Sequence, residues 1–297
     1  MEDVVCSLCG KKQASLYLEQ TDRFGSQQFT FKRCLNCGLI YLNPRPTMNE
    51  ISYYYPDVYE AFSEINTATV PEKSHIARSL KKQMGIIEAY TTKPGKLLDV
   101  GCAKGNFLIF AKTQGWQVTG IEPHAPSAFV AREKYGLNVL TGTLEPTTFP
   151  SCTFDVITLW DVLEHLPNPK TTLRTAKKIL RPDGIIVFSI PNLYSFDRFL
   201  FRSYWIGWDP PRHFTLFTEK TLTILLDEVG FQLLDSHCIT GGKGTFFLNL
   251  DLIIQHKPHI GWLKHLYPSI NLLLWPYRQI SYMLKRGPII TYIAKSR

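Results

Sequence analysis

The chain has 297 residues, of which 44% are hydrophobic, and its formal net charge is +8. This length holds one ordinary domain and a smaller module, and the hydrophobic share supplies a normal core, which excludes an intrinsically disordered chain. The start, Met1-Glu2-Asp3, lacks a basic and apolar leader, and no run approaches the roughly 20 apolar residues of a membrane helix. We therefore expect a cytoplasmic protein.

Two Cys-x-x-Cys pairs stand near the amino terminus, each followed directly by a glycine. Each pair makes a tight turn that presents two sulfurs to one ion, and two such turns complete a tetrahedral zinc site. Residues 28–32 alternate polar and aromatic side chains, as a strand of a zinc ribbon does. Such a closed site is structural, because catalytic zinc keeps an open position. The alternative is four reduced cysteines that only pack. The predicted ligands are Cys6, Cys9, Cys34 and Cys37.

Residues 43–47, with the sequence Asn-Pro-Arg-Pro-Thr, are typical of a linker. Farther along, residues 74–90 have the periodicity of an amphipathic helix that leads into the first strand of the next domain. The apolar face of this helix is predicted to consist of Ile76, Leu80, Met84 and Ile87.

A short apolar run that contains Asp99 leads into the loop Gly-Cys-Ala-Lys-Gly at residues 101–105 and then into a helical pattern. A second run, residues 116–121, ends in Glu122, which places an acid where a ribose would lie. A dinucleotide site would have Gly-x-Gly-x-x-Gly and a pyrophosphate here. The carboxylate of Asp99 would repel a diphosphate but attract a cationic amino acid. S-adenosylmethionine combines adenosine with such a cationic group.

Three further motifs follow in order, at residues 154–166, 180–184 and 185–192. Together with the glycine-bearing loop, they resemble the class I S-adenosylmethionine-dependent methyltransferases over roughly residues 90 to 297. The resemblance implies an α/β fold with a Rossmann-like, seven-stranded, mostly parallel sheet and helices on both faces. It also implies that the ligand lies at the carboxyl ends of the strands.

The resemblance implies which residues bind the donor. The loop after the first strand holds the methionine part, and Glu122 accepts hydrogen bonds from both ribose hydroxyls. Pro123 packs on the adenine, and Thr143 and Leu144 line its edge, although many relatives have Asp near position 143. An alternative role for Asp99 is that of a helix-capping or core acid. The full implied set is Asp99, Gly101, Cys102, Ala103, Gly105, Asn106, Phe107, Glu122, Pro123, Thr143, Leu144, Trp160 and Asp161.

Two histidines are candidates for a general base, which a hydroxyl acceptor would require. His165 follows the fourth strand, and an ordinary histidine pKa of about 6.5 suits proton abstraction near neutrality. His213 lies in a loop after the fifth strand, where relatives place acceptor-binding residues. A structural role is the alternative for both.

Relatives also carry a lid over the cofactor at a position that this chain fills with tyrosines. Packing against the sheet edge is the alternative for these side chains. The tyrosines are Tyr53, Tyr54, Tyr55 and Tyr59.

Most of the excess positive charge lies at the end of the chain. Residues 241–297 carry 8 Lys and Arg residues and 1 acidic residue, while the rest of the chain is nearly neutral. Strands are predicted at residues 232–239 and 289–294, and between them lies a helical insertion rich in aromatic and aliphatic residues. One prediction is that this insertion caps the pocket or forms a homodimer interface. The alternative is that it makes peripheral contact with acidic lipid headgroups.

These patterns predict a zinc ribbon at residues 1–43, a linker with lid helices at 44–92, and a methyltransferase domain at 93–297 with a helical insertion at 243–287. We expect O-methylation of a small molecule, sugar or lipid-linked glycan, since the chain resembles proteins that act on sugars, lipid-linked glycans or quinone precursors. The alternatives are a ribosomal RNA methyltransferase and a non-catalytic binding protein. A nearly neutral ribbon argues against nucleic acid, and an intact donor loop argues against loss of activity.

Overall fold

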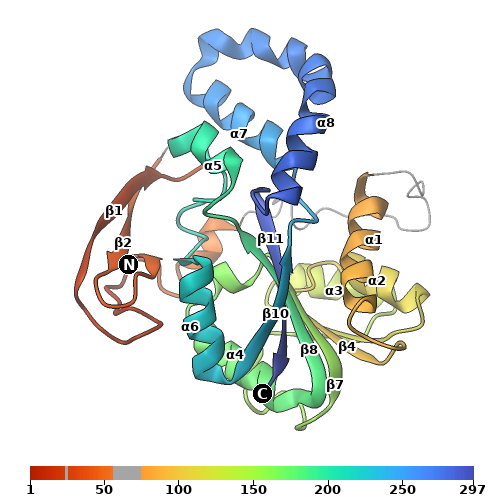
Figure 1. Ribbon diagram of the computed structural model, residues 1–297. Coiled ribbons are helices and arrows are strands. Elements are labelled where there is room, and N and C mark those ends of the chain that lie inside the picture. The colour runs from red at the N-terminus through yellow and green to blue at the C-terminus, as the bar shows by residue number, and fades with distance from the viewer. Residues whose placement is uncertain (24–25, 56–74) are drawn as a thin grey trace. The chain divides into compact units, whose positions relative to one another are not determined.

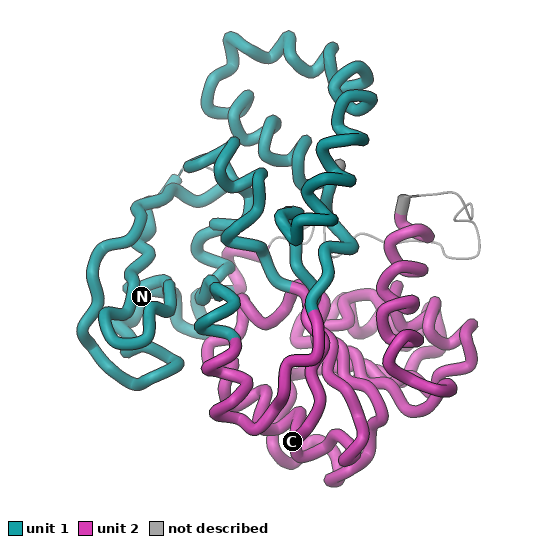
Figure 2. The backbone as a smooth tube through the Cα atoms, viewed as in Figure 1, with its two compact units in different colours: residues 1–51, 190–222, 236–291 teal, residues 52–189, 223–235, 292–297 magenta. Residues whose placement is uncertain are grey.

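The computed structural model describes residues 1–23, 26–55 and 75–297, so the predicted lid residue Tyr59 lies outside the described residues. The backbone forms two compact units, which Figure 2 colours separately. Unit 1 comprises residues 1–51, 190–222 and 236–291, and unit 2 comprises residues 52–189, 223–235 and 292–297. The domain boundaries stated above stay a prediction.

A seven-stranded sheet, most of whose residues belong to unit 2, carries the methyltransferase motifs. Its strand order is β10-β11-β8-β7-β4-β5-β6, and the pairs β4–β5, β4–β7, β5–β6 and β7–β8 are parallel. The predicted α/β fold with a seven-stranded, mostly parallel sheet is therefore confirmed. The strands are β4 (Lys96–Val100), β5 (Gln117–Glu122), β6 (Val139–Thr141), β7 (Phe154–Trp160), β8 (Leu180–Pro191), β10 (Phe231–His237) and β11 (Ile289–Ser296).

Helices cover the sheet because each has an apolar side. In Figure 1, α1 (His75–Glu88), α2 (Asn106–Thr113) and α3 (Ala125–Glu133) lie on one side of the strands, and α4 (Pro169–Ile179) and α6 (Glu219–Val229) lie on the other. In α1, Leu80, Met84 and Ile87 are buried in the core, as predicted. Ile76 is 40% exposed, which corrects its predicted place on the apolar face. It lies in the first turn of the helix, before the buried positions begin.

Unit 1 contains a second, antiparallel sheet of four strands in the order β1-β2-β3-β9. The first three are β1 (Ala14–Thr21), β2 (Gln28–Cys34) and β3 (Ile40–Leu42). The predicted strand at residues 28–32 is thus part of β2. β9 (Thr215–Leu216) comes from the middle of the chain and pairs with β3, and the amide of Leu42 also donates to the carbonyl of Phe214 at 2.9 Å. The sheet that follows the first cysteine pair therefore gains its fourth strand from residues far along the chain.

The predicted insertion before the last strand is helical, as expected. It consists of α7 (Lys243–His256), the 3₁₀ segment η5 (Pro258–Leu266) and α8 (Tyr267–Met283). Two polar contacts fix it within unit 1. The Asn249 side-chain oxygen accepts from the Ile206 amide at 2.6 Å, and the Tyr277 hydroxyl donates to Asp197 of α5 (Phe196–Phe201) at 2.6 Å. In the described part of the chain, no helix has the length and apolarity needed to cross a membrane.

A pair of glycines tests the packing of unit 2. A Cβ at Gly120 of β5 would lie 2.5 Å from the Cys102 sulfur and 2.7 Å from Leu108 Cδ1. We therefore expect Gly120→Ala to lower the free energy of unfolding by about 1–3 kcal/mol through overpacking. Gly85 in α1 has open space around its Cβ position, so Gly85→Ala should raise stability by about 0.5–1 kcal/mol. Urea unfolding would measure both, and equal effects of the two variants would contradict this packing.

Candidate active site and cysteine cluster

Asp99 is a buried carboxylate in the middle of the parallel sheet. It lies in β4 opposite Gly120 of β5 and Thr158 of β7, and its side chain is 3% exposed. The Thr158 hydroxyl donates to Asp99 Oδ1 at 2.7 Å. Burial raises the pKa of Asp99 to about 7, and the charge of Glu122 also raises it, while the Thr158 hydrogen bond opposes the shift. The site therefore favours a cationic ligand, which would stabilise the ionised form.

Glu122 is the second buried carboxylate, and the backbone holds it in place. Its two side-chain oxygens accept the amides of Ala103 and His124, each at 2.8 Å. Burial raises the pKa of Glu122, while these two amides oppose the shift. Each carboxylate oxygen can accept a second hydrogen bond. This geometry suits recognition of two neighbouring hydroxyls by one acid.

The loop between β4 and α2 depends on glycine at two positions. Gly101 and Gly105 have φ values of +75° and +82°, in the left-handed region. A Cβ at Gly101 would lie 2.5 Å from Val162 Cγ2, and a Cβ at Gly105 would lie 2.4 Å from Leu137 Cδ1. The two glycines are therefore needed both for conformation and for close packing of the loop.

Four other predicted donor residues lie in or beside this loop. Burial raises the pKa of the Cys102 thiol, which keeps it neutral and therefore a poor nucleophile. Phe107 of α2 is buried and packs edge-on against Trp160 of β7, with ring centroids 5.3 Å apart. Within the described residues, Asn106 Oδ1 and Trp160 Nε1 are buried without a hydrogen-bond partner. Such buried atoms are ones that a ligand can satisfy.

The predicted adenine-side residues follow β5 and β6. Pro123 is exposed, Leu144 is buried, and the Thr143 hydroxyl donates to Glu145 Oε1 at 2.8 Å. Their contact with an adenine stays a prediction.

Asp161 follows β7 with a φ of +55°, a conformation that asparagine and aspartate tolerate better than most residues. The Ser189 hydroxyl fixes it by accepting from the Asp161 amide at 2.9 Å and donating to Asp161 Oδ1 at 2.6 Å. Ser189 and Thr158 were not among the predicted site residues. Both are polar positions within buried strands, and that departure from the apolar pattern is the signal that marks them.

His165 lies in a short 3₁₀ turn, η3 (Leu163–His165), after β7. Its Nδ1 is hydrogen-bonded to the Tyr55 hydroxyl at 3.0 Å, and the two rings meet edge to face with centroids 6.2 Å apart. Tyr55 thus fixes the orientation of the imidazole. Tyr53 is 84% exposed, whereas Tyr55 contacts a candidate catalytic group through this hydrogen bond.

His213 lies within unit 1 and is buried. Its Nδ1 is 2.9 Å from the carbonyl oxygen of Gly207. Because a carbonyl only accepts, Nδ1 carries the proton, and the neutral ring has its lone pair on Nε2. Burial lowers the pKa of His213, against the attraction of Asp209, whose carboxylate lies 3.9 Å from Nε2. Arg212 holds Asp209 through two hydrogen bonds of 2.5 and 3.0 Å.

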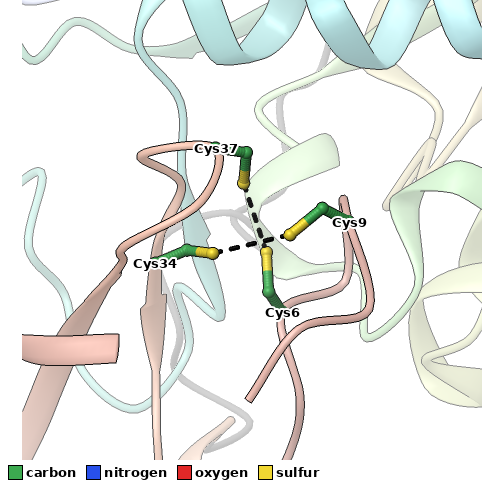
Figure 3. A group of neighbouring side chains, drawn as sticks. All are labelled: Cys6, Cys9, Cys34 and Cys37. Atoms are coloured by element: carbon green, nitrogen blue, oxygen red, sulfur yellow. Dashed lines mark hydrogen bonds between the residues drawn. The ribbon is translucent and has the colours of Figure 1, made fainter. Parts of the chain in front are cut away.

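The four cysteines near the amino terminus converge on one point, as Figure 3 shows. All four sulfur atoms lie within 4.8 Å of one another, and two sulfur pairs are 3.5 Å apart. A tetrahedral zinc ion with bonds of about 2.3 Å separates its sulfurs by about 3.8 Å. The observed spacing therefore fits a four-thiolate metal site. The cysteines are Cys6, Cys9, Cys34 and Cys37.

The family model described as "Methyltransferase domain" matches residues 73–236, which is more than half of the chain. The chain belongs to this methyltransferase family. The resemblance to class I S-adenosylmethionine-dependent methyltransferases is thereby confirmed.

Curated relatives match a part of the same domain. The ubiquinone biosynthesis O-methyltransferase of Actinobacillus pleuropneumoniae serotype 5b (strain L20) is 35% identical over 107 residues, which are 33% of this chain and 46% of that protein. The protein of the same name from Azoarcus sp. (strain BH72) is 34% identical over 112 residues, which are 36% and 48% of the two chains. This methyltransferase thus spans about half the length of the curated relatives it matches.

Among solved structures, the PH0226 protein from Pyrococcus horikoshii OT3 superposes with a TM-score of 0.53 at 16% sequence identity. The match covers 83% of this chain and 99% of that protein. At this identity the match supports the fold alone.

The buried Asp99 gives a pH-dependent prediction for the ligand-free protein. Its pKa is raised from 3.8 to about 7 on folding, so the folded state loses stability relative to the unfolded state as the pH rises through this range. Asp99→Asn removes that loss. We expect the stability advantage of the Asn variant to grow by up to about 1.4 kcal/mol per pH unit between these values, and then to level off.

Urea unfolding from about pH 4 to about pH 8 would measure this difference. The exposed Asp183→Asn variant is a matched control and should show no such trend. A stability difference between the two proteins that does not change between about pH 4 and about pH 7 would contradict the prediction.

Proposed function

We propose that this methyltransferase moves a methyl group from S-adenosylmethionine to a hydroxyl oxygen of a small molecule, sugar or lipid-linked glycan. The observation that carries the proposal is the pair of buried carboxylates on either side of a loop whose glycines permit close approach. Asp99 favours a cationic amino acid, and Glu122 is held by two amides so that it can receive a ribose diol. When bound, the donor supplies an electrophilic methyl group on a positively charged sulfur.

Other predicted donor residues complete this pocket. Asn106 Oδ1 and Trp160 Nε1 are buried polar atoms that lack hydrogen-bond partners within the described residues. Asp161, held by Ser189, stands at the end of β7. The relatives named as ubiquinone biosynthesis O-methyltransferases support oxygen as the accepting atom.

Proton removal from the acceptor is assigned to His165. Its ring is fixed through Nδ1 by the Tyr55 hydroxyl, so Tyr55 acts as a positioning residue. His213 is the second candidate, since its neutral tautomer presents a lone pair on Nε2. In either case the histidine takes the hydroxyl proton as the oxygen attacks the methyl group.

We also propose that the four clustered cysteines hold a structural zinc ion. The spacing of the sulfurs fits a tetrahedral ion, and a four-thiolate site leaves no position for substrate. The role of the metal is to hold together the turns that flank the sheet of unit 1.

The histidine assignment is tested by methyl transfer from labelled donor into fractionated cell extract, which needs no knowledge of the acceptor. We expect His165→Ala to lower turnover by about 10²–10⁴-fold, with donor affinity unchanged. Tyr55→Phe should lower turnover less, because the ring remains but loses its orientation. Near-wild-type rates in both His165→Ala and His213→Ala would contradict a histidine base.

The zinc proposal is tested by metal analysis of the purified protein, in which we expect about one zinc ion per chain. Cys9→Ser should lose the ion and several kcal/mol of stability, because metal binding contributes to folding. The exposed Cys152 is a matched control, and Cys152→Ser should keep both zinc and stability. Full stability of a metal-free protein would show that the cysteines only pack.

A further inference from the structure

The helical insertion has an unusual distribution of apolar side chains. On α8, Leu274 and Ser281 are buried and Tyr277 bonds to Asp197, so this side faces the rest of unit 1. The opposite side carries no charged residue and exposes several large apolar side chains around the polar Gln279. We call it the outer face of α8, and it consists of Leu272, Trp275, Ile280 and Met283, which are 77%, 61%, 54% and 82% exposed.

The positions in the outer face follow helical spacing, so these side chains lie together on one side of the helix, with Gln279 among them. Trp262 of η5 is 59% exposed, and Leu284, directly after the helix, is exposed to the same extent. An α-helix at a protein surface normally turns polar residues outward. A contiguous exposed apolar patch of this kind marks an interaction surface.

The charge around the outer face indicates the partner. Within the helical insertion, residues 243–287 carry 6 basic residues and a single acid, Asp251. Lys264 is 56% exposed at the side chain although it pairs with Asp251 at 3.0 Å. Lys285 follows the helix and is exposed, and its ammonium group donates to the Ser236 hydroxyl at 3.2 Å. A symmetric homodimer built on this face would bring two strongly basic segments against each other. An anionic surface would instead be attracted.

We infer that the outer face of α8 docks on a membrane surface that contains anionic lipid. The outer face would enter the boundary between headgroups and acyl chains, with Trp275 and Trp262 at headgroup depth. Lys264 and Lys285 would reach the phosphates. α7 and α8 lie at one end of unit 1 (Figures 1 and 2). The inference does not depend on the reaction that the protein catalyses.

The test uses the full chain and vesicle flotation. Wild-type protein should float with vesicles that contain phosphatidylglycerol and stay in solution with vesicles of phosphatidylcholine alone. Trp275→Glu should abolish flotation. Phe129 of α3 is 59% exposed, so Phe129→Glu is a matched control that should float as the wild type does. Lys264→Gln and Lys285→Gln should each weaken binding about fivefold, from about 1 kcal/mol per charge near the surface.

Circular dichroism and melting of each variant separate lost binding from lost folding. Failure of the folded wild type to bind anionic vesicles would overturn the inference, as would equal binding to both kinds of vesicle. Size-exclusion chromatography supplies one more outcome. A wild-type dimer that Trp275→Glu converts to a monomer would show that the outer face joins two copies of this chain.

Discussion

The site in unit 2 depends on the burial of two carboxylates at the ends of neighbouring parallel strands. Burial raises the pKa of both Asp99 and Glu122, because a charged carboxylate loses water that the sheet cannot replace. Thr158 and two loop amides offset part of this cost. The part of the cost that remains would be reduced by a bound cation. The burial that destabilises the empty site therefore favours binding of a cationic donor.

The surrounding loop explains why these acids serve an adenosine ligand without phosphates. Left-handed backbone at Gly101 and Gly105 lets the loop curl tightly, and the Ala103 amide is turned onto Glu122. A phosphate-binding loop donates its backbone amides to the phosphate oxygens, but here the Ala103 amide donates to the Glu122 carboxylate. In unit 1, the clustered cysteines stand beside a four-stranded sheet, and the proposed metal would add to the stability of the turns that carry them.

The sequence predicted those features whose cause is local. The run ending in Asp99 and Val100, the acid at position 122 and the two Cys-x-x-Cys turns each carry their signal within a few residues, and the structure forms the sheet and the cysteine cluster accordingly. The pairing of β9 with β3 was not predicted, nor was the Tyr55 contact with His165, because both join residues far apart in the chain. Periodicity also cannot show where along a helix the packing against the core begins. Ile76 has the predicted spacing but lies in the first turn of α1, where it is exposed.

Calorimetric titration with S-adenosylmethionine at about pH 6 and about pH 8 tests the central claim most directly. If the donor binds ionised Asp99, wild-type affinity should be about fivefold weaker at pH 6 than at pH 8, because a carboxyl with a pKa near 7 must first lose its proton. The donor's own amino group, ordinarily titrating near pH 8, acts in the opposite direction. Asp99→Asn should therefore bind no more weakly at pH 6 than at pH 8. Wild-type affinity that is unchanged or greater at pH 6 would contradict the account.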